Sequence, residues 1–201
     1  CIPIINSFLE KGWEVVLASD GDALELLKKE YPSLKFYELP GYDIKYTYRS
    51  VVANMFVNLR SFYRGALKEN DAIREIVEKE KPDLILSDNR YGVRNKSCKS
   101  IFLGHQLRLK AGNRLFSFLG TRINRRLINH FDELWIVDYE NGQSLAGTLS
   151  KSNMAIPFQY IGPLSRFEKR DEGIEYDLCA IISGPEPQRS SFQELLLDQL
   201  S

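Results

Sequence analysis

Two polar segments that directly follow apolar runs carry the side chains best suited to move a proton. Asp88 follows the apolar residues 84–86, and His105 follows the apolar run 101–104. A carboxylate, or an imidazole with its usual pKa of about 6.5, can accept a proton from a hydroxyl group. We therefore predict Asp88 and His105 as catalytic residues. The alternatives are an Asx turn that ends a strand at Asp88, and a histidine at position 105 that only bonds to backbone.

Amide and guanidinium groups stand beside both candidates. Asn89 and Arg90 follow Asp88, and Gln106 follows His105. An amide both donates and accepts hydrogen bonds, and arginine adds a fixed positive charge with a planar set of donors. These groups suit the hydroxyls of a sugar or another polar acceptor. We therefore predict Asn89, Arg90 and Gln106 as acceptor-binding residues.

A third polar segment, residues 183–190, reads Ser-Gly-Pro-Glu-Pro-Gln-Arg-Ser. It follows a strand expected at 177–182 and precedes a helix expected at 191–200. Gly184 lets backbone approach a ligand closely, and the free N–H groups of a helix N-terminus attract a diphosphate. The alternative is a plain strand–turn–helix junction with a serine, Ser190 or Ser191, as the helix cap. The residues predicted to bind a nucleotide sugar are Ser183, Gly184, Glu186, Gln188 and Arg189.

The elements that must position these segments alternate along the chain. Strands are expected at residues 14–18, 34–39, 83–87, 100–104, 133–138, 158–161 and 177–182. Helices are expected at 2–11, 22–30, 49–81 with a candidate interruption at Gly65, 114–130 and 191–200. This alternation predicts βαβ units and a parallel sheet. Ligands of such sheets bind outside the carboxyl ends of the strands, where the three polar segments fall.

The composition narrows the classes of protein. The chain has 201 residues, 43% of them hydrophobic and 27% charged, which is typical of a globular protein. Lys+Arg and Asp+Glu both number 27, and a neutral chain is a poor general binder of nucleic acid. No apolar run reaches the length of a membrane span. The three cysteines are widely spaced and give neither a disulfide framework nor a zinc-ligand pattern, and the chain has only two histidines. We therefore expect no metal, no cofactor and a cytoplasmic protein.

The expected helix at 114–130 is both basic and amphipathic. One interpretation is contact with an anionic membrane surface, which would place the protein peripherally at the inner membrane face, or with a lipid diphosphate acceptor. The other, which we prefer, is an apolar stripe that faces the core and a basic face in solvent. The basic residues are Arg114, Arg122, Arg125 and Arg126, and the apolar residues are Leu115, Phe116, Phe118, Leu119, Ile123 and Leu127.

The chain opens on Cys1 and a helix, with no strand before it. Cys1 could be an N-terminal nucleophile, a lipidated cysteine, or an internal residue of a longer chain. We favour the last, because an apolar helix follows directly and a doubly wound sheet normally begins with its central strand. The polar run 168–173 indicates a hinge, and the chain after it indicates the start of another domain.

Several segments together resemble a known family. They are residues 101–106, Ile-Phe-Leu-Gly-His-Gln; 111–114, Ala-Gly-Asn-Arg; 81–86, Lys-Pro-Asp-Leu-Ile-Leu; 161–164, Ile-Gly-Pro-Leu; and 183–189. The chain resembles the N-terminal domain of GT-B glycosyltransferases of the family 28 type. This group includes the bacterial enzymes that add N-acetylglucosamine to lipid-linked muramoyl-pentapeptide. The glutamate that these enzymes carry between the matching histidine and glutamine is absent here.

The resemblance implies a Rossmann-like doubly wound parallel sheet plus the beginning of a second Rossmann-like domain. Residues 1–165 would form the acceptor domain without its first strand, 166–176 the hinge, and 177–201 the start of the nucleotide-sugar domain. The implied reaction moves a sugar from a nucleotide diphosphate sugar, with UDP as the expected nucleotide, to a carbohydrate or lipid-linked acceptor hydroxyl. It would invert the sugar and need no metal. Asn113 joins the acceptor-binding residues on this resemblance.

Two other classes stay open. One is a GT-B-fold hydrolase or epimerase that acts on nucleotide sugars. The other is a non-catalytic binding module that uses the aromatic residues of segment 42–48 and the basic helix.

Overall fold

The computed structural model describes residues 1–42, 51–110, 113–140, 143–167, 173, 176–183, 186 and 188–200, with backbone alone at 51–60. Its residues divide into two compact units, Cys1–Arg166 and Phe167–Ser201. None of the helices in these ranges is long and apolar enough to cross a membrane.

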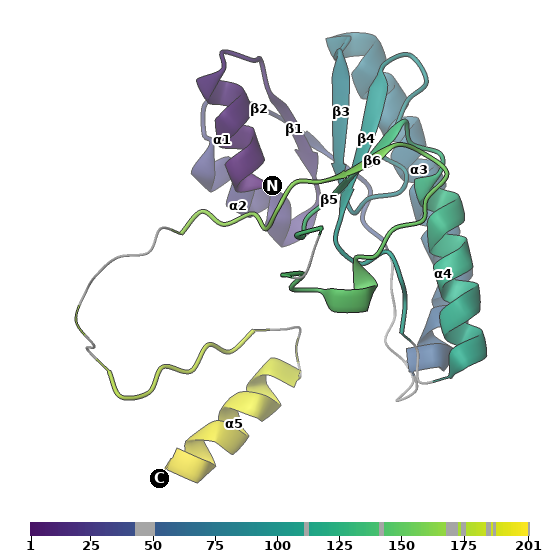
Figure 1. Cartoon of the computed structure of the whole chain (residues 1–201). Helices are drawn as coiled ribbons and strands as arrows, with labels where there is room; N and C mark the ends of the chain where they lie inside the picture. Colours follow the sequence, from purple (N-terminus) through teal and green to yellow (C-terminus); the bar gives the residue numbers. More distant parts are fainter. Residues whose placement is uncertain are drawn as a thin grey trace. The chain divides into compact units, whose positions relative to one another are not determined.

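The first unit alternates strands and helices, as the sequence predicts (Figure 1). Its helices are α1 (Ile2–Glu10), α2 (Gly21–Glu30), α3 (Val51–Glu80) and α4 (Arg114–Ile128), with a short 3₁₀ helix at Gly147–Leu149. Its strands are β1 (Val16–Ser19), β2 (Lys35–Glu38), β3 (Leu84–Asp88), β4 (Lys99–Gly104), β5 (Glu133–Ile136) and β6 (Phe158–Tyr160). The six strands expected before residue 165 are confirmed, with ends that shift by one or two residues.

The expected interruption of the long helix at Gly65 is wrong, because α3 runs on through this residue. The glycine is there for packing. A Cβ atom at Gly65 would lie 2.8 Å from the ring of Tyr42, which is too close for a side chain. A residue that breaks helices in isolation here makes room for an aromatic ring.

All strand pairs are parallel. β1 pairs with β2, and a second sheet has the order β3-β4-β5-β6. In Figure 1, β1 and β3 lie next to each other between β2 and β4. No strand in the described ranges pairs with the edge of β1 that faces away from β2 or with the edge of β3 that faces away from β4. This mixed α/β arrangement, with a four-stranded parallel sheet flanked by helices, is consistent with the Rossmann-like fold that the alternation predicts.

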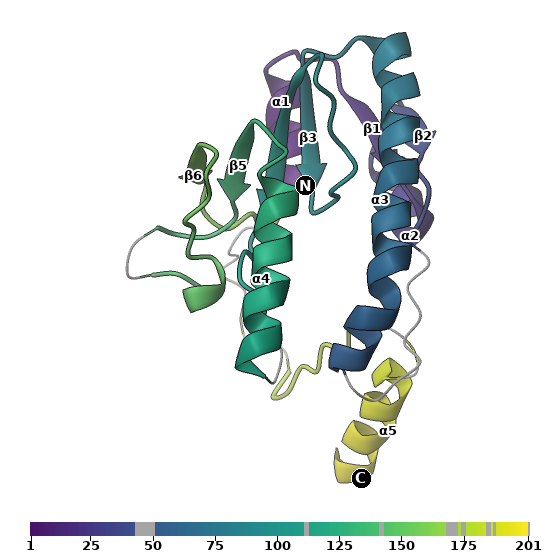
Figure 2. The same cartoon turned by 90° about the vertical axis from the view of Figure 1, so that its right-hand side faces the viewer.

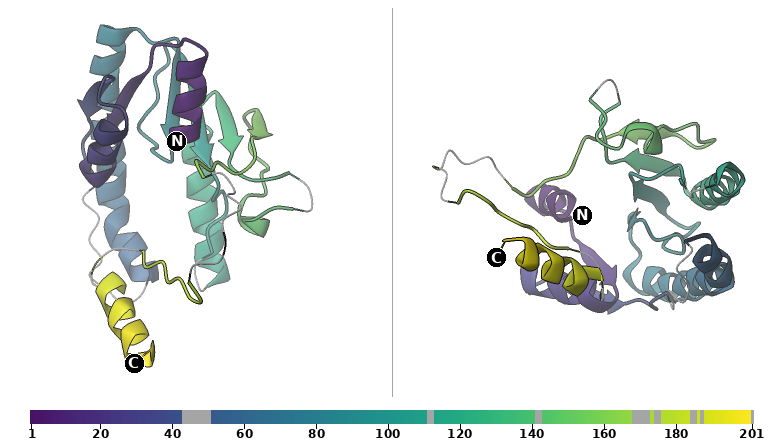
Figure 3. Two further views of the ribbon diagram at one scale, coloured as in Figure 1. Left: turned by 90° about the vertical axis from the view of Figure 1, so that its left-hand side faces the viewer. Right: turned by 90° about the horizontal axis from the view of Figure 1, so that it is seen from below.

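Helices cover both faces of the strands. α3 packs on one face through Ile73 and Val77, which contact Ile85 of β3. α4 lies on the same face and buries Ile128 against Phe102 of β4 (Figure 2). α1 and α2 cover the other face around Leu17 of β1 (Figure 3). Central strand β4 is buried over its last five residues, as expected of a parallel strand in the middle of a sheet.

The second unit corrects two expectations. Residues 177–182 form no strand, and helix α5 (Gln188–Leu200) begins three residues earlier than expected. A strand needs a neighbour to accept and donate its backbone hydrogen bonds, and none pairs with these residues in the described part of the unit. No residue of α5 is buried. That residues 177–201 begin a further domain stays a prediction.

Candidate functional site

Asp88 and His105 lie at the carboxyl ends of two adjacent strands. Asp88 is the last residue of β3 and lies opposite Leu103 of β4, so His105 follows two residues beyond that level. The side chain of Asp88 is 52% exposed. Its Oδ2 accepts a hydrogen bond from the thiol of Cys1 at 2.8 Å, and the α-amino group lies 3.7 Å away. His105 and its neighbour Gln106 are exposed as well. The structure therefore brings the two predicted catalytic residues to one edge.

The turn after Asp88 is tightly fixed. Asn89 has a φ of 56°, in the left-handed region that asparagine tolerates better than most residues. Its N–H still donates to the carbonyl of Leu103 at 3.0 Å. The hydroxyl of Ser87 donates to the carbonyl of Arg90 at 2.5 Å and closes the turn. The backbone that carries Asp88 and Asn89 is thus held on both sides.

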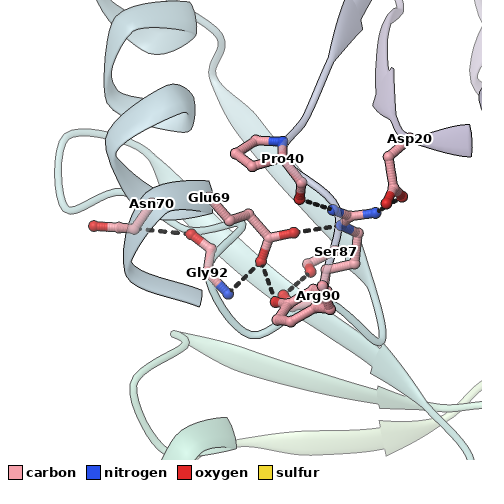
Figure 4. Close-up of polar contacts among 8 residues, drawn as sticks. Asp20, Pro40, Glu69, Asn70, Ser87, Arg90 and Gly92 are labelled. Carbon is pink, nitrogen blue, oxygen red and sulfur yellow. Dashed lines mark hydrogen bonds and ion pairs between the residues drawn. The ribbon is translucent and has the colours of Figure 1, made fainter. Parts of the chain in front are cut away.

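Arg90 occupies the centre of a buried network instead of reaching into solvent (Figure 4). Its Nε donates to Glu69 and its Nη1 to Asp20. Its Nη2 donates to the carbonyl of Pro40 at 3.1 Å. Burial disfavours the charged guanidinium, but the bonds with Glu69 and Asp20 outweigh it and raise the pKa of Arg90. The prediction that Arg90 binds an acceptor stays untested, and these internal partners already use three of its donors.

Glu69 is the fully buried anchor of this network, with none of its surface exposed. Besides Arg90 it accepts hydrogen bonds from the N–H of Gly92 at 2.8 Å and the hydroxyl of Tyr42 at 2.6 Å. Burial and this carboxylate together raise the pKa of Tyr42. Gly92 must be glycine, because a Cβ atom there would lie 2.3 Å from the carbonyl oxygen of Ala66. Helix α3 thus fixes the loop that follows β3.

Sequence reasoning missed Glu69 and its neighbour Asn70. Asn70 Nδ2 donates to the carbonyls of Gly92 and Arg94, each at 2.8 Å. Both residues lie on a helix rich in charged side chains, and they read as part of its solvent face. Their partners are more than twenty residues away in sequence, so no local signal reveals them.

The segment after β4 is held from helix α4. Asn124, which is buried, donates from Nδ2 to the carbonyls of Gln106 and Leu107, each at 3.2 Å. It accepts a hydrogen bond from the hydroxyl of Tyr91 at 2.5 Å. Asn113, predicted to bind an acceptor, caps α4 by accepting from the N–H of Leu115 at 2.8 Å. Its carbonyl side is therefore already occupied.

Asp138, in the segment after β5, is a structural hub. It is 1% exposed and accepts hydrogen bonds from the hydroxyls of Ser144 and Ser150 and from the N–H groups of Tyr139 and Leu145. Burial alone would raise the pKa of this carboxyl, but its hydrogen-bond donors hold the pKa well below its usual range. The carboxylate shapes its own loop and leaves no lone pair for catalysis.

The predicted nucleotide-sugar segment is held by its own carboxylate. Glu186 accepts hydrogen bonds from the Nε of Arg189 and the hydroxyl of Ser190, each at 2.7 Å, and from the Ser190 N–H at 3.4 Å. These bonds lower the pKa of Glu186. Neither Ser190 nor Ser191 precedes the helix as its cap, because α5 begins at Gln188. Ser183 and Gln188 are exposed, and Gly184 lies outside the described residues.

Helix α4 overturns the preferred interpretation of its apolar residues. Its buried positions are Gly120, Asn124 and Ile128. Four of the apolar residues expected to face the core are exposed instead: Leu115 and Phe118 at 61% each, Leu119 at 38% and Ile123 at 39%. The helix packs through Gly120, Asn124 and Ile128, with Ile128 in the core beside Phe102 and Asn124 bonded to the segment after β4.

Two hollows of the described surface lie along α4. One of about 420 Å³ is lined by Arg108, Lys110, Phe118 and Arg125 among others, and one of about 530 Å³ by Arg122, Arg125, Arg126 and Asn129 among others. Both are rich in cations. Across the described ranges, no three His, Cys, Asp or Glu side chains gather as metal ligands do.

Comparison with known proteins yields no family model, no curated protein and no solved structure that matches this chain.

Proposed function

We propose that this chain is the acceptor-binding part of a glycosyltransferase that uses a nucleotide diphosphate sugar, with UDP as the expected nucleotide. The observation that carries the proposal is the pairing of exposed Asp88 and exposed His105 at the carboxyl edge of a parallel sheet. Ligands of such sheets bind at this edge. Two groups able to accept a proton therefore lie where an acceptor would bind.

The proposed reaction replaces one bond at the sugar's anomeric carbon by another. The acceptor oxygen forms a bond to this carbon while the bond from the carbon to the diphosphate oxygen breaks, with inversion. His105 or Asp88 takes the proton of the acceptor hydroxyl, a role that contributes about 10² to 10⁴ in rate in enzymes generally. The electron pair of the broken bond leaves with the diphosphate.

The hydrogen-bond network around Arg90 holds the loops next to this site in place. Three segments, those after β1, β2 and β3, meet at the Arg90 guanidinium through Asp20, Pro40 and the turn itself. A site held by buried ion pairs keeps its reacting groups in place, which is worth more in catalysis than an extra contact to a flexible loop. In this proposal Arg90 and Glu69 are positioning residues, and Asn89 and Gln106 contact the acceptor.

The diphosphate would bind beside segment 183–189 in the second unit. The N–H of Ser190 and the Arg189 guanidinium are the donors that an anion needs, and at present Glu186 holds both. A bound diphosphate would therefore take the place of the Glu186 carboxylate. Replacing this residue by glutamine is expected to strengthen nucleotide binding, because it removes the competing negative charge.

Calorimetry tests the part of the proposal that concerns binding of the nucleotide sugar. UDP and UDP-N-acetylglucosamine are titrated into the protein and into the Glu186→Gln and Arg189→Ala variants. We expect heat with the unaltered protein, tighter binding with Glu186→Gln and weaker binding with Arg189→Ala. No heat at millimolar ligand in any of the three would contradict UDP as the nucleotide.

The alternative functions, a hydrolase, an epimerase and a non-catalytic binding module, are distinguished by their products. A hydrolase would release free sugar without any acceptor, and an epimerase would convert the nucleotide sugar with no release of nucleotide. A non-catalytic module would do neither. Of the aromatic segment 42–48 that such a module would use, Tyr42 alone lies within the described residues, and its hydroxyl is bonded to Glu69.

A further inference from the structure

The two loops that carry the predicted catalytic residues begin where the pairing of β3 and β4 ends. The last paired positions are Asp88 and Leu103. Asn89 follows on one side, and His105 with Gln106 follows on the other. Backbone pairing holds two strands at a fixed separation only as far as their register extends. A contact outside the sheet is therefore needed to keep His105 in place relative to Asp88.

Tyr91, in the loop after β3, makes one end of such a contact. Its hydroxyl donates a hydrogen bond to Oδ1 of Asn124 on α4 at 2.5 Å. Its ring contacts those of Phe62 and Phe102, with centroid distances of 5.3 and 5.2 Å. Burial raises the pKa of Tyr91 to about 12, so the hydroxyl keeps the proton that it donates throughout the neutral range. The loop after β3 is therefore tied to helix α4 by a packed side chain.

The amide of Asn124 makes the other end of the contact, in the loop after β4. Its Nδ2 donates to the carbonyls of Gln106 and Leu107, each at 3.2 Å, and the residue is 4% exposed. An asparagine amide has donors at one end and an acceptor at the other, so a hydroxyl donor and two carbonyls allow a single orientation. If the amide were turned over, its oxygen would lie against two carbonyl oxygens. One side chain, held in one orientation, thus bonds to both loops.

The backbone around His105 is held on both sides. Gly104 and Leu107 are buried, and only His105 and Gln106 between them are exposed. The carbonyl of Gly104 and the N–H of Leu107 are bonded to the backbone of other segments. The bond from Asn124 to the Gln106 carbonyl adds a third hold within this short segment. A displacement of Asn124 would therefore move the backbone that carries His105.

From these contacts we propose that Tyr91 and Asn124 together fix the position of His105 relative to Asp88. We call the two residues the Tyr91–Asn124 link. The inference rests on the proposed function, in which both predicted catalytic residues face one acceptor, and it makes Tyr91 and Asn124 positioning residues. Neither side chain transfers the proton. A reacting group that is displaced by about 1 Å can lose about 10²-fold in rate, so the link affects turnover from outside the site.

The alternative is that the link only stabilises the fold, and the chain offers a matched pair of residues that separates the two roles. The hydroxyl of Tyr31, at the C-terminal end of α2, donates to Oδ1 of Asn6 on α1, also at 2.5 Å. Replacing tyrosine by phenylalanine removes the same hydroxyl and the same kind of hydrogen bond in both places. The Tyr31→Phe variant is therefore the control for Tyr91→Phe.

Hydrogen exchange of the whole chain tests the link without an assay of activity. The N–H groups of Leu107 and Arg108, which both donate to the Leu149 carbonyl, report the opening of the loop after β4. We expect them to exchange at least about tenfold faster in Tyr91→Phe, although the altered residue belongs to the other loop. In Tyr31→Phe they should exchange within about twofold of the rate in the unaltered protein.

Asn124→Asp tests the link from its other end. A carboxylate still accepts the hydrogen bond of the Tyr91 hydroxyl, but it cannot donate to the two carbonyls of the loop after β4. We expect this variant to speed the exchange of the Leu107 N–H at least as much as Tyr91→Phe does. The N–H of Leu39, which donates to the Ser19 carbonyl at 2.8 Å in the other sheet, is the internal reference and should keep its rate in both variants.

Turnover separates a positioning role from a structural one. The assay is the release of UDP from UDP-N-acetylglucosamine in the presence of acceptor. We expect Tyr91→Phe to lower kcat by about tenfold or more and to leave KM for the nucleotide sugar within about twofold, because the link lies away from the segment proposed to bind the nucleotide. Tyr31→Phe, which loses an equivalent hydrogen bond, should change neither constant.

Unchanged exchange at Leu107 in Tyr91→Phe would overturn the proposal. So would a rise that is the same in Tyr31→Phe, or the same at Leu39, since either result means a general loss of stability. An active protein whose kcat does not change in Tyr91→Phe would overturn it too. If the unaltered protein releases no UDP, the proposed function fails, and the exchange rates alone decide whether the link holds the two loops together.

Discussion

A single arginine connects the segments that follow three strands. Arg90 joins Asp20, which is 70 residues away in sequence, to Glu69 of α3 and to the Pro40 carbonyl. Buried charges are costly to remove from water, and a pair that is fully bonded roughly offsets this cost. The network therefore fixes the positions of these three segments and adds little to the net free energy of unfolding. Breaking one half of it, however, leaves the other half buried without its counter-charge.

Glu69→Gln tests the network at its buried end. The variant keeps the shape of the side chain and removes its charge, so Arg90 loses its strongest buried partner. We expect the free energy of unfolding to fall by about 3 kcal/mol, as for other broken buried ion pairs. Denaturant unfolding measures this, and hydrogen exchange should show faster exchange at Gly92, whose N–H bonds to Glu69. Glu75→Gln, at an exposed position of the same helix, is the control. A similar loss in both variants would contradict the network.

From the lowered pKa of Asp138 we predict how the free energy of unfolding changes with pH, including the direction of the change. Its pKa is lowered in the folded protein, so its carboxylate stabilises the fold above the unfolded pKa of about 3.9 and loses this contribution as the pH falls below that value. We expect Asp138→Asn to lower stability at pH 7 and to flatten the decline of the unfolding free energy between about pH 5 and pH 2. Thermal unfolding across this range measures both effects. If Asp138→Asn and the exposed control Asp83→Asn gave the same pH profile as the unaltered protein, the assignment would fail.

Among the elements, α4 shows most clearly where sequence patterns stop being informative. Its range could be predicted to within two residues, because its apolar residues recur at helical spacing. Its orientation could not. An apolar stripe predicts the face that packs only if the core is its partner, and here Asn124 ties the helix to the loop after β4. The wrong expectation followed from counting apolar residues without knowing which side chains bond across the sheet.

The Asn113 cap of α4 is expected to contribute to the stability of the protein. Asn113→Ala removes the acceptor of the Leu115 N–H and should lower the unfolding free energy by about 1 kcal/mol. Asn113→Ser keeps a capping oxygen and should lose only a few tenths of that amount. Denaturant unfolding of the three proteins measures the difference. Equal stabilities for the alanine and serine variants would mean that the cap does not support the helix.

The six strands of the first unit could be predicted from the sequence, whereas the strand expected at 177–182 does not form. One physical reason accounts for both outcomes. The apolar run 101–104 is buried, and strand β4, to which it belongs, pairs with β3 on one side and with β5 on the other. Residues 177–182 have the same kind of sequence, but no strand pairs with them in the described part of their unit. Strand propensity expresses itself only where packing and a partner complete it.

The parallel sheet of the first unit brings residues that are distant in the sequence to the edge where its strands end. Parallel strands β3 and β4 end side by side, which brings Asp88 and His105 to the same edge although they are 17 positions apart in the sequence. The alternation of strands and helices was sufficient to predict this meeting. The Glu69 and Arg90 network that holds the edge was not predictable, because it depends on side chains of α3 that the sequence pattern assigns to solvent.

Release of UDP from UDP-N-acetylglucosamine, followed over time with lipid-linked and carbohydrate acceptors, tests the proposed chemistry most directly. His105→Ala and Asp88→Asn are compared with His130→Ala, which replaces the other histidine, and with Asp83→Asn, at the opposite end of β3 from Asp88. The account predicts release by the unaltered protein, a fall of about a hundredfold or more in at least one of the first two variants, and unchanged rates in the two controls. No release with any acceptor, or equal losses in variants and controls, would contradict it.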